Sequence, residues 1–192
     1  MTHRDNLGIG TKEQSDCWKR HGETGLLFSR DDATGLRRYI VGGRQYDEVV
    51  EGIFVGPEHW DYPGLRLVAE AILDLRWMNP EDRELASRKA AMAGLEYANF
   101  GFDDGCLPAE ALLQDALQWL AERHGQGIPC LVHCSAGVSR SPFLLCLYLL
   151  PRFQWDLEET MRYLVSRRRE ALPARLYLDY LRRQVSERTL PK

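Results

Sequence analysis

The sequence has little that would crosslink it, anchor it in a membrane or bind a metal. Its five cysteines are odd in number and include no Cys-x-x-Cys pair, so neither a disulfide framework nor a zinc site is indicated. Residues 1–10 are polar and lack the apolar core of a signal peptide. The longest apolar run, near 142–151, is too short to cross a bilayer. These absences favour a cytoplasmic protein with reduced thiols and no expected contact with a membrane.

An excess of charge of one sign is also missing. The 25 Lys and Arg residues nearly balance the 28 Asp and Glu residues, which gives a net charge of −3. This balance gives no global reason to expect a nucleic-acid partner. The hydrophobic fraction of 44% is ordinary for a globular protein, and 192 residues favour one domain with an extension. We expect an N-terminal extension of unknown role over 1–43 and a single domain over 44–188.

Strand and helix patterns alternate along most of the chain. Apolar runs predict strands at 51–56, 71–75, 95–100 and 128–133, and two more at 26–30 and 36–41 flank a turn in the extension. Capping residues and helical spacing predict helices at 80–94, 108–125, 141–150, 157–169 and 175–186. The alternation predicts an α/β fold, with a mostly parallel central sheet of about four to five strands and helices on both faces.

The loop over 133–141 carries the strongest chemical signal. An apolar strand leads into Cys134, then into small residues and a helix, so successive N–H groups point at one place. Gly137 permits the tight turn, and the Arg140 guanidinium can grip two oxygens of a phosphate. The residues expected to bind the phosphate are Ser135, Ala136, Gly137, Val138, Ser139 and Arg140.

The same positive field activates Cys134 as a nucleophile. Helix N-termini and nearby cations lower a thiol pKa from about 8.5 to about 3.5–7.5, and the thiolate can form a phosphocysteine. Ser141 is placed to donate a hydrogen bond to the sulfur, and His133 to order the loop. A buried structural cysteine would explain a lone Cys after a strand, but the complete Cys-x5-Arg string favours catalysis. This chemistry needs neither a metal nor a cofactor.

A proton donor for the leaving group is expected in the segment 102–108. Asp104 lies four residues before Pro108 and is the preferred general acid, with Asp103 as the alternative. Cys106 follows two residues later. A protective disulfide with Cys134 is one hypothesis, and an inert loop cysteine is the favoured one.

These motifs resemble those of the protein tyrosine phosphatase superfamily. The string over 133–141 is its signature, and the portion 136–141 is similar to the dual-specificity branch. The segment 46–56 looks like the first strand of that branch, and Asp104-Gly105-x-x-Pro108 resembles its general-acid loop. The resemblance covers about 45–188, with 157–181 similar to the closing helices.

The resemblance implies a phosphatase with a metal-free, two-step mechanism. Cys134 attacks, Arg140 and the loop amides hold the phosphoryl oxygens, and Asp104 first protonates the leaving oxygen and then activates water. Arg169 matches a position at the pocket rim that can hold a second anion, or it belongs to a solvated helix end. Ala174 departs from the Asn that members usually carry there, which bears on the rim rather than on the chemistry.

The expected substrate is a phosphorylated protein. No segment resembles the deep tyrosine-recognition pocket, so we expect hydrolysis of phosphotyrosine and also of phosphoserine and phosphothreonine. A phosphatase for a non-protein ester, such as a lipid, a glucan or an RNA, is the first competing function. The absence of a cation at 135–139 disfavours inositol lipids. A non-catalytic phosphoprotein-binding module, a sulfurtransferase and an arsenate reductase are further functions that a loop with this cysteine and arginine could serve.

Overall fold

The computed structural model describes residues 19–21, 26–31 and 35–187. The predictions for the segment 1–10, for residues 32–34 of the turn expected at 31–35 and for the thiol of Cys17 lie outside these residues.

All strands of the described residues belong to one mixed sheet, in the order β1-β2-β3-β4-β5-β8-β6-β7. The strands are β1 (Lys19–His21), β2 (Leu26–Arg30), β3 (Arg37–Val41), β4 (Arg44–Val50), β5 (Ile53–Gly56), β6 (Ala71–Arg76), β7 (Glu96–Phe102) and β8 (Cys130–His133). The helices are α1 (Tyr62–Leu65), α2 (Pro80–Met92), α3 (Glu110–Gly125), α4 (Arg140–Phe153), α5 (Leu157–Arg167) and α6 (Arg175–Glu187).

The predicted α/β class is confirmed, although the sheet is larger and more mixed than expected. The pairs β5–β8, β8–β6 and β6–β7 are parallel, as the alternation of strands and helices predicts. The four pairs from β1 to β5 are antiparallel. A short turn joins β3 to β4, where Gly42 and Gly43 adopt φ of 54° and 77°. Strands before residue 43 therefore continue the sheet instead of forming a separate layer.

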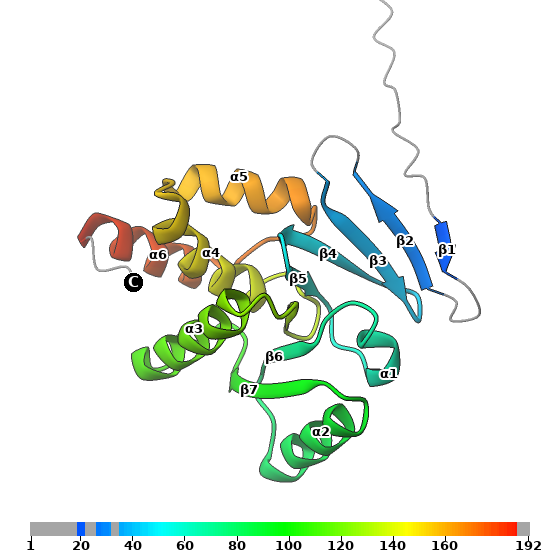
Figure 1. The fold of residues 1–192 in the computed structure, drawn as a ribbon. Helices are drawn as coiled ribbons and strands as arrows, with labels where there is room; N and C mark the ends of the chain where they lie inside the picture. The colour runs from blue at the N-terminus through cyan, green and yellow to red at the C-terminus, as the bar shows by residue number, and fades with distance from the viewer. Residues whose placement is uncertain (1–18, 22–25, 32–34, 188–192) are drawn as a thin grey trace, which may run out of the picture.

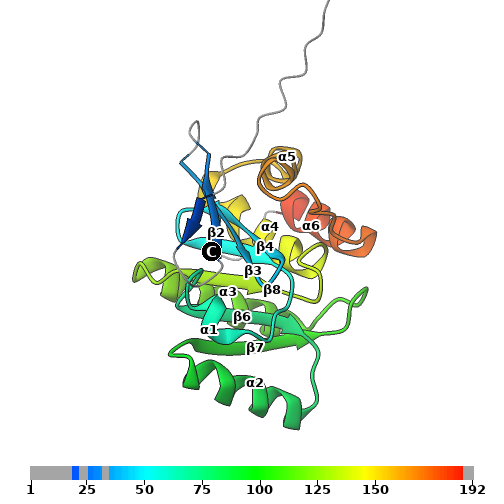
Figure 2. The same cartoon turned by 90° about the vertical axis from the view of Figure 1, so that its right-hand side faces the viewer.

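Helices cover both faces of the sheet, as expected (Figures 1 and 2). One core packs β4 to β8 against α3, α4, α5 and α6, and the other packs the opposite face against α1 and α2. The predicted start of α2 is confirmed, because the Asn79 side chain accepts a hydrogen bond from the Asp82 N–H at 2.8 Å. The helices thus hold the buried strands in place and leave the carboxyl ends of the parallel strands at one edge.

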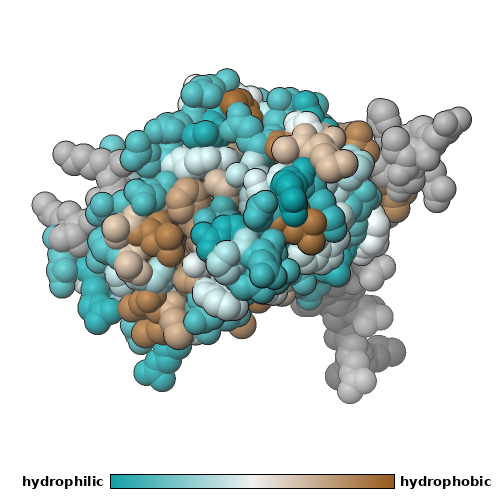
Figure 3. Space-filling model, turned by 90° about the horizontal axis from the view of Figure 1, so that it is seen from below, coloured by the Kyte–Doolittle hydropathy of each residue, from teal (hydrophilic) through white to brown (hydrophobic). Residues whose placement is uncertain are grey.

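The molecular surface is mainly hydrophilic on the face that carries α2 and α3. Apolar side chains gather there only in small separate patches (Figure 3). Within the described residues, each helix is either too short or too polar to cross a lipid bilayer.

Candidate active site

Cys134 lies at the start of the loop that joins β8 to α4. Its side chain is buried, and α4 begins at Arg140. Gly137 turns the loop with φ of 67°, and a Cβ there would overlap the carbonyl group of Gly56 at the end of β5. Only glycine combines this left-handed conformation with so close an approach of two backbones. The tight turn predicted at Gly137 is therefore present, and it is packed against the neighbouring parallel strand.

The surroundings of Cys134 favour its thiolate. Burial alone would raise the thiol pKa, but hydrogen bonds from the Ser141 side chain and from the backbone N–H groups of Ser141 and Gly137, together with Arg140, lower it. The Ser141 hydroxyl is buried and has no nitrogen or oxygen partner in the described part of the chain. The hydrogen-bond donors around the sulfur of Cys134 thus favour the thiolate, which is the form a nucleophile requires.

Arg140 is fixed by one edge of its guanidinium, while its other edge stays available. Its Nη1 donates to the carbonyl oxygens of Phe102 at 2.8 Å and Leu75 at 3.3 Å. Its Nη2 donates to the Ser135 hydroxyl at 3.1 Å, and the buried Nε has no hydrogen-bond partner among the described residues. An edge made of Nε and Nη2 suits two oxygens of one phosphate.

A second arginine, Arg168, supports the loop from behind. Its Nε donates to the Gly137 carbonyl at 2.8 Å and its Nη2 to the Ala136 carbonyl at 3.0 Å. The buried carboxylate of Asp47 on β4 holds Nη1 of Arg168 at 3.0 Å. Because these carbonyls are bound on the outer side of the loop, its N–H groups are left to face the sulfur and the phosphate site.

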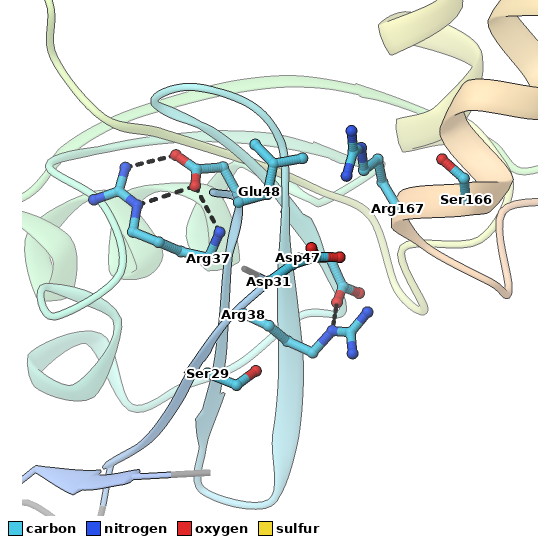
Figure 4. A pocket seen from close by; sticks show the side chains of 9 residues that line it. Ser29, Asp31, Arg37, Arg38, Asp47, Glu48, Ser166 and Arg167 are labelled. Atoms are coloured by element: carbon cyan, nitrogen blue, oxygen red, sulfur yellow. Dashed lines mark hydrogen bonds and ion pairs between the residues drawn. The ribbon is translucent and has the colours of Figure 1, made fainter. Parts of the chain in front are cut away.

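The residues around Asp47 form a polar cavity of about 300 Å³ between the strands β2 to β4 and the end of α5 (Figure 4). Asp47 also accepts a hydrogen bond from Arg38 at 2.7 Å. Next to it, Arg37 pairs with the buried Glu48, with Nη2 and Oε1 2.6 Å apart. Both arginines come from β3, so the segment before residue 43 supplies partners for two buried acids of β4, of which Asp47 is linked to the loop through Arg168.

His133 is held beside the loop by a network of charged residues. Its Nδ1 lies 3.3 Å from the Cys134 carbonyl oxygen, and its Nε2 lies 3.6 Å from the Asp74 carboxylate. Asp74 also binds Arg76, which in turn pairs with Glu58. Complete burial lowers the pKa of His133, although Asp74 opposes this shift. A neutral, buried histidine fits the expected ordering role better than proton transfer.

Asp104, the expected general acid, lies next to Arg140 of the catalytic loop. The Oδ1 of Asp104 is 3.8 Å from Nε of Arg140, and the carboxylate is 59% exposed. The N–H of Gly105 donates to the hydroxyl of Tyr177 at 3.0 Å, which ties this segment to α6. Asp103 is also exposed, and its backbone carbonyl accepts from the N–H of Cys106. The structure therefore brings Asp104 to the Nε side of the Arg140 guanidinium, and the choice between the two acids stays a prediction.

The structure also places three further residues that the sequence analysis singled out. Arg169 is exposed after the end of α5, while its neighbour Arg168 points inward to the loop. Ala174 donates its backbone N–H to the Ser139 hydroxyl at 3.1 Å. Cys106 is exposed and Cys134 buried, and both are free thiols, so the disulfide between them stays a hypothesis.

Sequence reasoning missed the buried charges that hold the loop: Asp47, Asp74, Arg76 and Arg168. A signal for one of them was present, because Asp74 interrupts the apolar run at the start of β6, and a buried acid requires a partner. Within the described residues, no three His, Cys, Asp or Glu side chains gather as a metal site would require.

The chain matches a known protein family and resembles several known proteins. The family described as "Dual specificity phosphatase, catalytic domain" matches residues 81–185, more than half of the chain. The chain is 26% identical over 127 residues to Protein phosphatase Slingshot homolog 2 of Homo sapiens, covering 66% of this chain and 9% of that protein. It is 35% identical over 74 residues to Dual specificity protein phosphatase 5 of Rattus norvegicus, covering 38% of this chain and 19% of that protein.

A solved structure, PTPMT1 in complex with PI(5)P, shares the fold. Its TM-score is 0.63 at 21% identity, over 75% of this chain and 96% of that one. The chain spans less than a fifth of the length of the two relatives named above.

Proposed function

This chain belongs to the dual specificity phosphatase family and is a cysteine-dependent phosphatase, and from this premise we propose that it acts on phosphorylated proteins. The proposed substrates carry phosphotyrosine and also phosphoserine or phosphothreonine. The phosphatase chemistry rests on the placement of Cys134, which is buried in the loop beside Ser141 and Arg140. The observation that carries the choice of protein substrates is the open cleft next to Asp104.

The proposed reaction has two steps. In the first, the Cys134 sulfur attacks phosphorus, the bond from phosphorus to the ester oxygen breaks, and Asp104 gives its proton to that oxygen. The phosphoryl group is now bound to sulfur, and Arg140 and the loop amides stabilise its oxygens. In the second, water attacks phosphorus and gives a proton to Asp104. The sulfur leaves as a thiolate, assisted by the Ser141 hydroxyl.

Two observations support a broad specificity for phosphorylated side chains. The Asp104 carboxylate is more than half exposed, and the cleft beside it is open rather than deep. A shallow site of this kind accepts the short side chains of phosphoserine and phosphothreonine as well as the longer phosphotyrosine.

A phosphoinositide is the second candidate substrate, because the PTPMT1 structure is described as a complex with PI(5)P. The segment Ser135–Ser139 supplies no cationic side chain for further phosphates of an inositol ring. Protein substrates are therefore preferred.

The proposal also includes a division of the chain. Residues 44–188 form the catalytic domain, and 1–43 form an extension whose strands lengthen the sheet and pair with Asp47 and Glu48. Location in the cytoplasm is part of the proposal, supported by the free thiols of Cys106, Cys130, Cys134 and Cys146.

A substrate panel tests the proposal. Phosphate release is measured for the wild type, Cys134→Ser and Cys106→Ser on p-nitrophenyl phosphate, phosphotyrosine and phosphothreonine peptides, and vesicles containing PI(5)P. We expect the wild type and Cys106→Ser to hydrolyse the peptides and Cys134→Ser to be inactive on every substrate. Turnover of the vesicles with no turnover of either peptide would overturn the choice of protein substrates.

A further inference from the structure

A shallow apolar cleft of about 610 Å³ lies beside the catalytic loop, next to the start of α6. Its lining combines Asp104 and Ser139 with the apolar side chains of Leu172, Pro173, Ala174 and Leu178. Leu172 is 69% exposed, a high value for a leucine beside a polar reaction centre. Because the cleft shares Asp104 with the acid segment and Ser139 with the loop, it is continuous with the catalytic site.

Hydrogen bonds hold both walls of the cleft in place. The N–H of Leu172 donates to the Val138 carbonyl at 2.8 Å, and the N–H of Ala174 donates to the Ser139 hydroxyl at 3.1 Å. On the opposite side, the N–H of Gly105 donates to the buried Tyr177 at 3.0 Å. The cleft is thus preformed, which lowers the entropic cost of binding a ligand there.

We propose that this cleft binds an apolar side chain of the substrate protein, from the residue directly next to the phosphorylated one. This inference rests on the proposed action on phosphoproteins. Neighbouring Cα atoms are about 3.8 Å apart, so the residue next to the phosphorylated one lies close to a wall whose backbone is bonded directly to the catalytic loop. Leu172 and Leu178 give the cleft its preference, because they exclude water from an apolar side chain but offer no partner to a polar one.

The size of the cleft and the charge at its edge favour a peptide over a bilayer. Arg175 also lines it, and the side chain of Arg175 is 93% exposed. A surface that inserts into a membrane needs a broad apolar face, whereas the apolar lining here comes from four residues. At about 610 Å³ the cleft has room for one apolar side chain of a substrate together with part of the adjoining peptide.

Paired phosphopeptides test the inference. The two peptides of a pair differ only in having Leu or Ser directly beside the phosphotyrosine, and one pair is made for each side. The kcat/KM of every peptide is measured with the wild type and with Leu172→Ser, Ala174→Asn and Leu176→Ser. For the wild type we expect about a tenfold preference for Leu on one side of the phosphotyrosine. Leu172→Ser and Ala174→Asn should reduce this ratio to about one to three. Leu176 is the matched control. It lies on α6, as Leu178 does, and is 40% exposed but does not line the cleft, so Leu176→Ser should keep the preference for Leu.

The outcomes separate the inference from the proposed function. Equal turnover of all peptides by the wild type would overturn the inference and leave protein substrates in place. Turnover of p-nitrophenyl phosphate without turnover of any peptide would overturn both. The inference would also be overturned if Leu172→Ser and Ala174→Asn fold and keep the wild-type preference for Leu over Ser. If these two variants lose activity only on PI(5)P vesicles, the inference is overturned as well, and the cleft binds a lipid.

Discussion

The two halves of the sheet contribute differently to the same loop. In the parallel half, the carboxyl ends of β8 and β7 lead directly to Cys134 and to the Asp104 segment. In the antiparallel half, β4 contributes Asp47, which reaches the loop only through Arg168. Both halves contain buried residues, yet one supplies the proposed reacting groups and the other supplies support. The comparison teaches that the chemistry follows the direction of the strands, whereas the shape of the loop also depends on the neighbouring half.

The largest expected difference between the halves comes from two glycines with positive φ. Gly137→Ala should reduce kcat/KM at least about 10³-fold, because its Cβ overlaps the Gly56 carbonyl and distorts the amides around the phosphate. Gly43→Ala in the antiparallel half has open space around its Cβ and should cost only about 1–2 kcal/mol of stability, with activity retained. Kinetics on p-nitrophenyl phosphate and chemical denaturation measure both. Similar activity in the two variants would contradict the comparison.

The next effect concerns the proposed general acid, which follows a strand of the parallel half. Asp104→Asn should slow hydrolysis of phenyl phosphate, which has a poor leaving group, by about 10²–10³-fold, and that of a better leaving group much less. Asp103→Asn is the matched control and should remain close to wild type. If Asp103→Asn shows the dependence on the leaving group instead, the general acid is Asp103.

A smaller effect is expected from the support that links the two halves. Arg168→Met leaves two loop carbonyls without their partner and Asp47 with Arg38 as its remaining arginine, so kcat/KM should fall about 10–100-fold and stability by about 1–3 kcal/mol. The pH profile of alkylation by iodoacetamide should move to higher pH, since a disordered loop stabilises the Cys134 thiolate less well. Exposed Arg169→Met is the control. An unshifted profile in folded Arg168→Met would show that the antiparallel half does not shape the loop.

The smallest effect on activity is expected at Arg37, within the antiparallel half. Burial opposes ionisation of Glu48, but bonds from Arg37 and Gly52 keep its pKa below the usual value. A lowered pKa in the folded state gives stability that is present above about pH 4.3 and is lost as the pH falls below it. Arg37→Met should therefore cost about 1–3 kcal/mol at pH 7 and much less at pH 3, with activity changed less than about twofold.

Urea denaturation at pH 7, 5 and 3 measures this difference, with exposed Arg44→Met as the control. A cost that is independent of pH would mean that Arg37 acts through packing on Phe54, whose ring centre is 5.2 Å from its guanidinium carbon.

Much of the local structure followed from short-range signals. The cap at Asn79 and the proline after it start α2 where expected, and glycine ends α3 at Gly125. The strand, loop and helix around Cys134 were also predicted, because their residues interact mainly with near neighbours. The antiparallel extension of the sheet was not predicted. The strands at 26–30 and 37–41 could have paired with each other without joining the central sheet.

Short-range signals do not predict which arginine at the end of α5 contacts the catalytic loop. Arg167, Arg168 and Arg169 follow one another at the end of α5, and the sequence offered no means to tell which of them faces the loop. The end of the helix at Arg167 turns Arg168 inward, toward a carboxylate 121 residues away.

The sequence by itself determined the order of strand, thiol, amide-rich loop, arginine and helix, because contacts within a few residues build that unit. Only the tertiary structure decided that Arg168 supports the loop, that Gly137 must be small and that Asp104 lies beside Arg140. The partners in these contacts are far apart along the chain, and they meet only because the order of strands in the sheet brings them together.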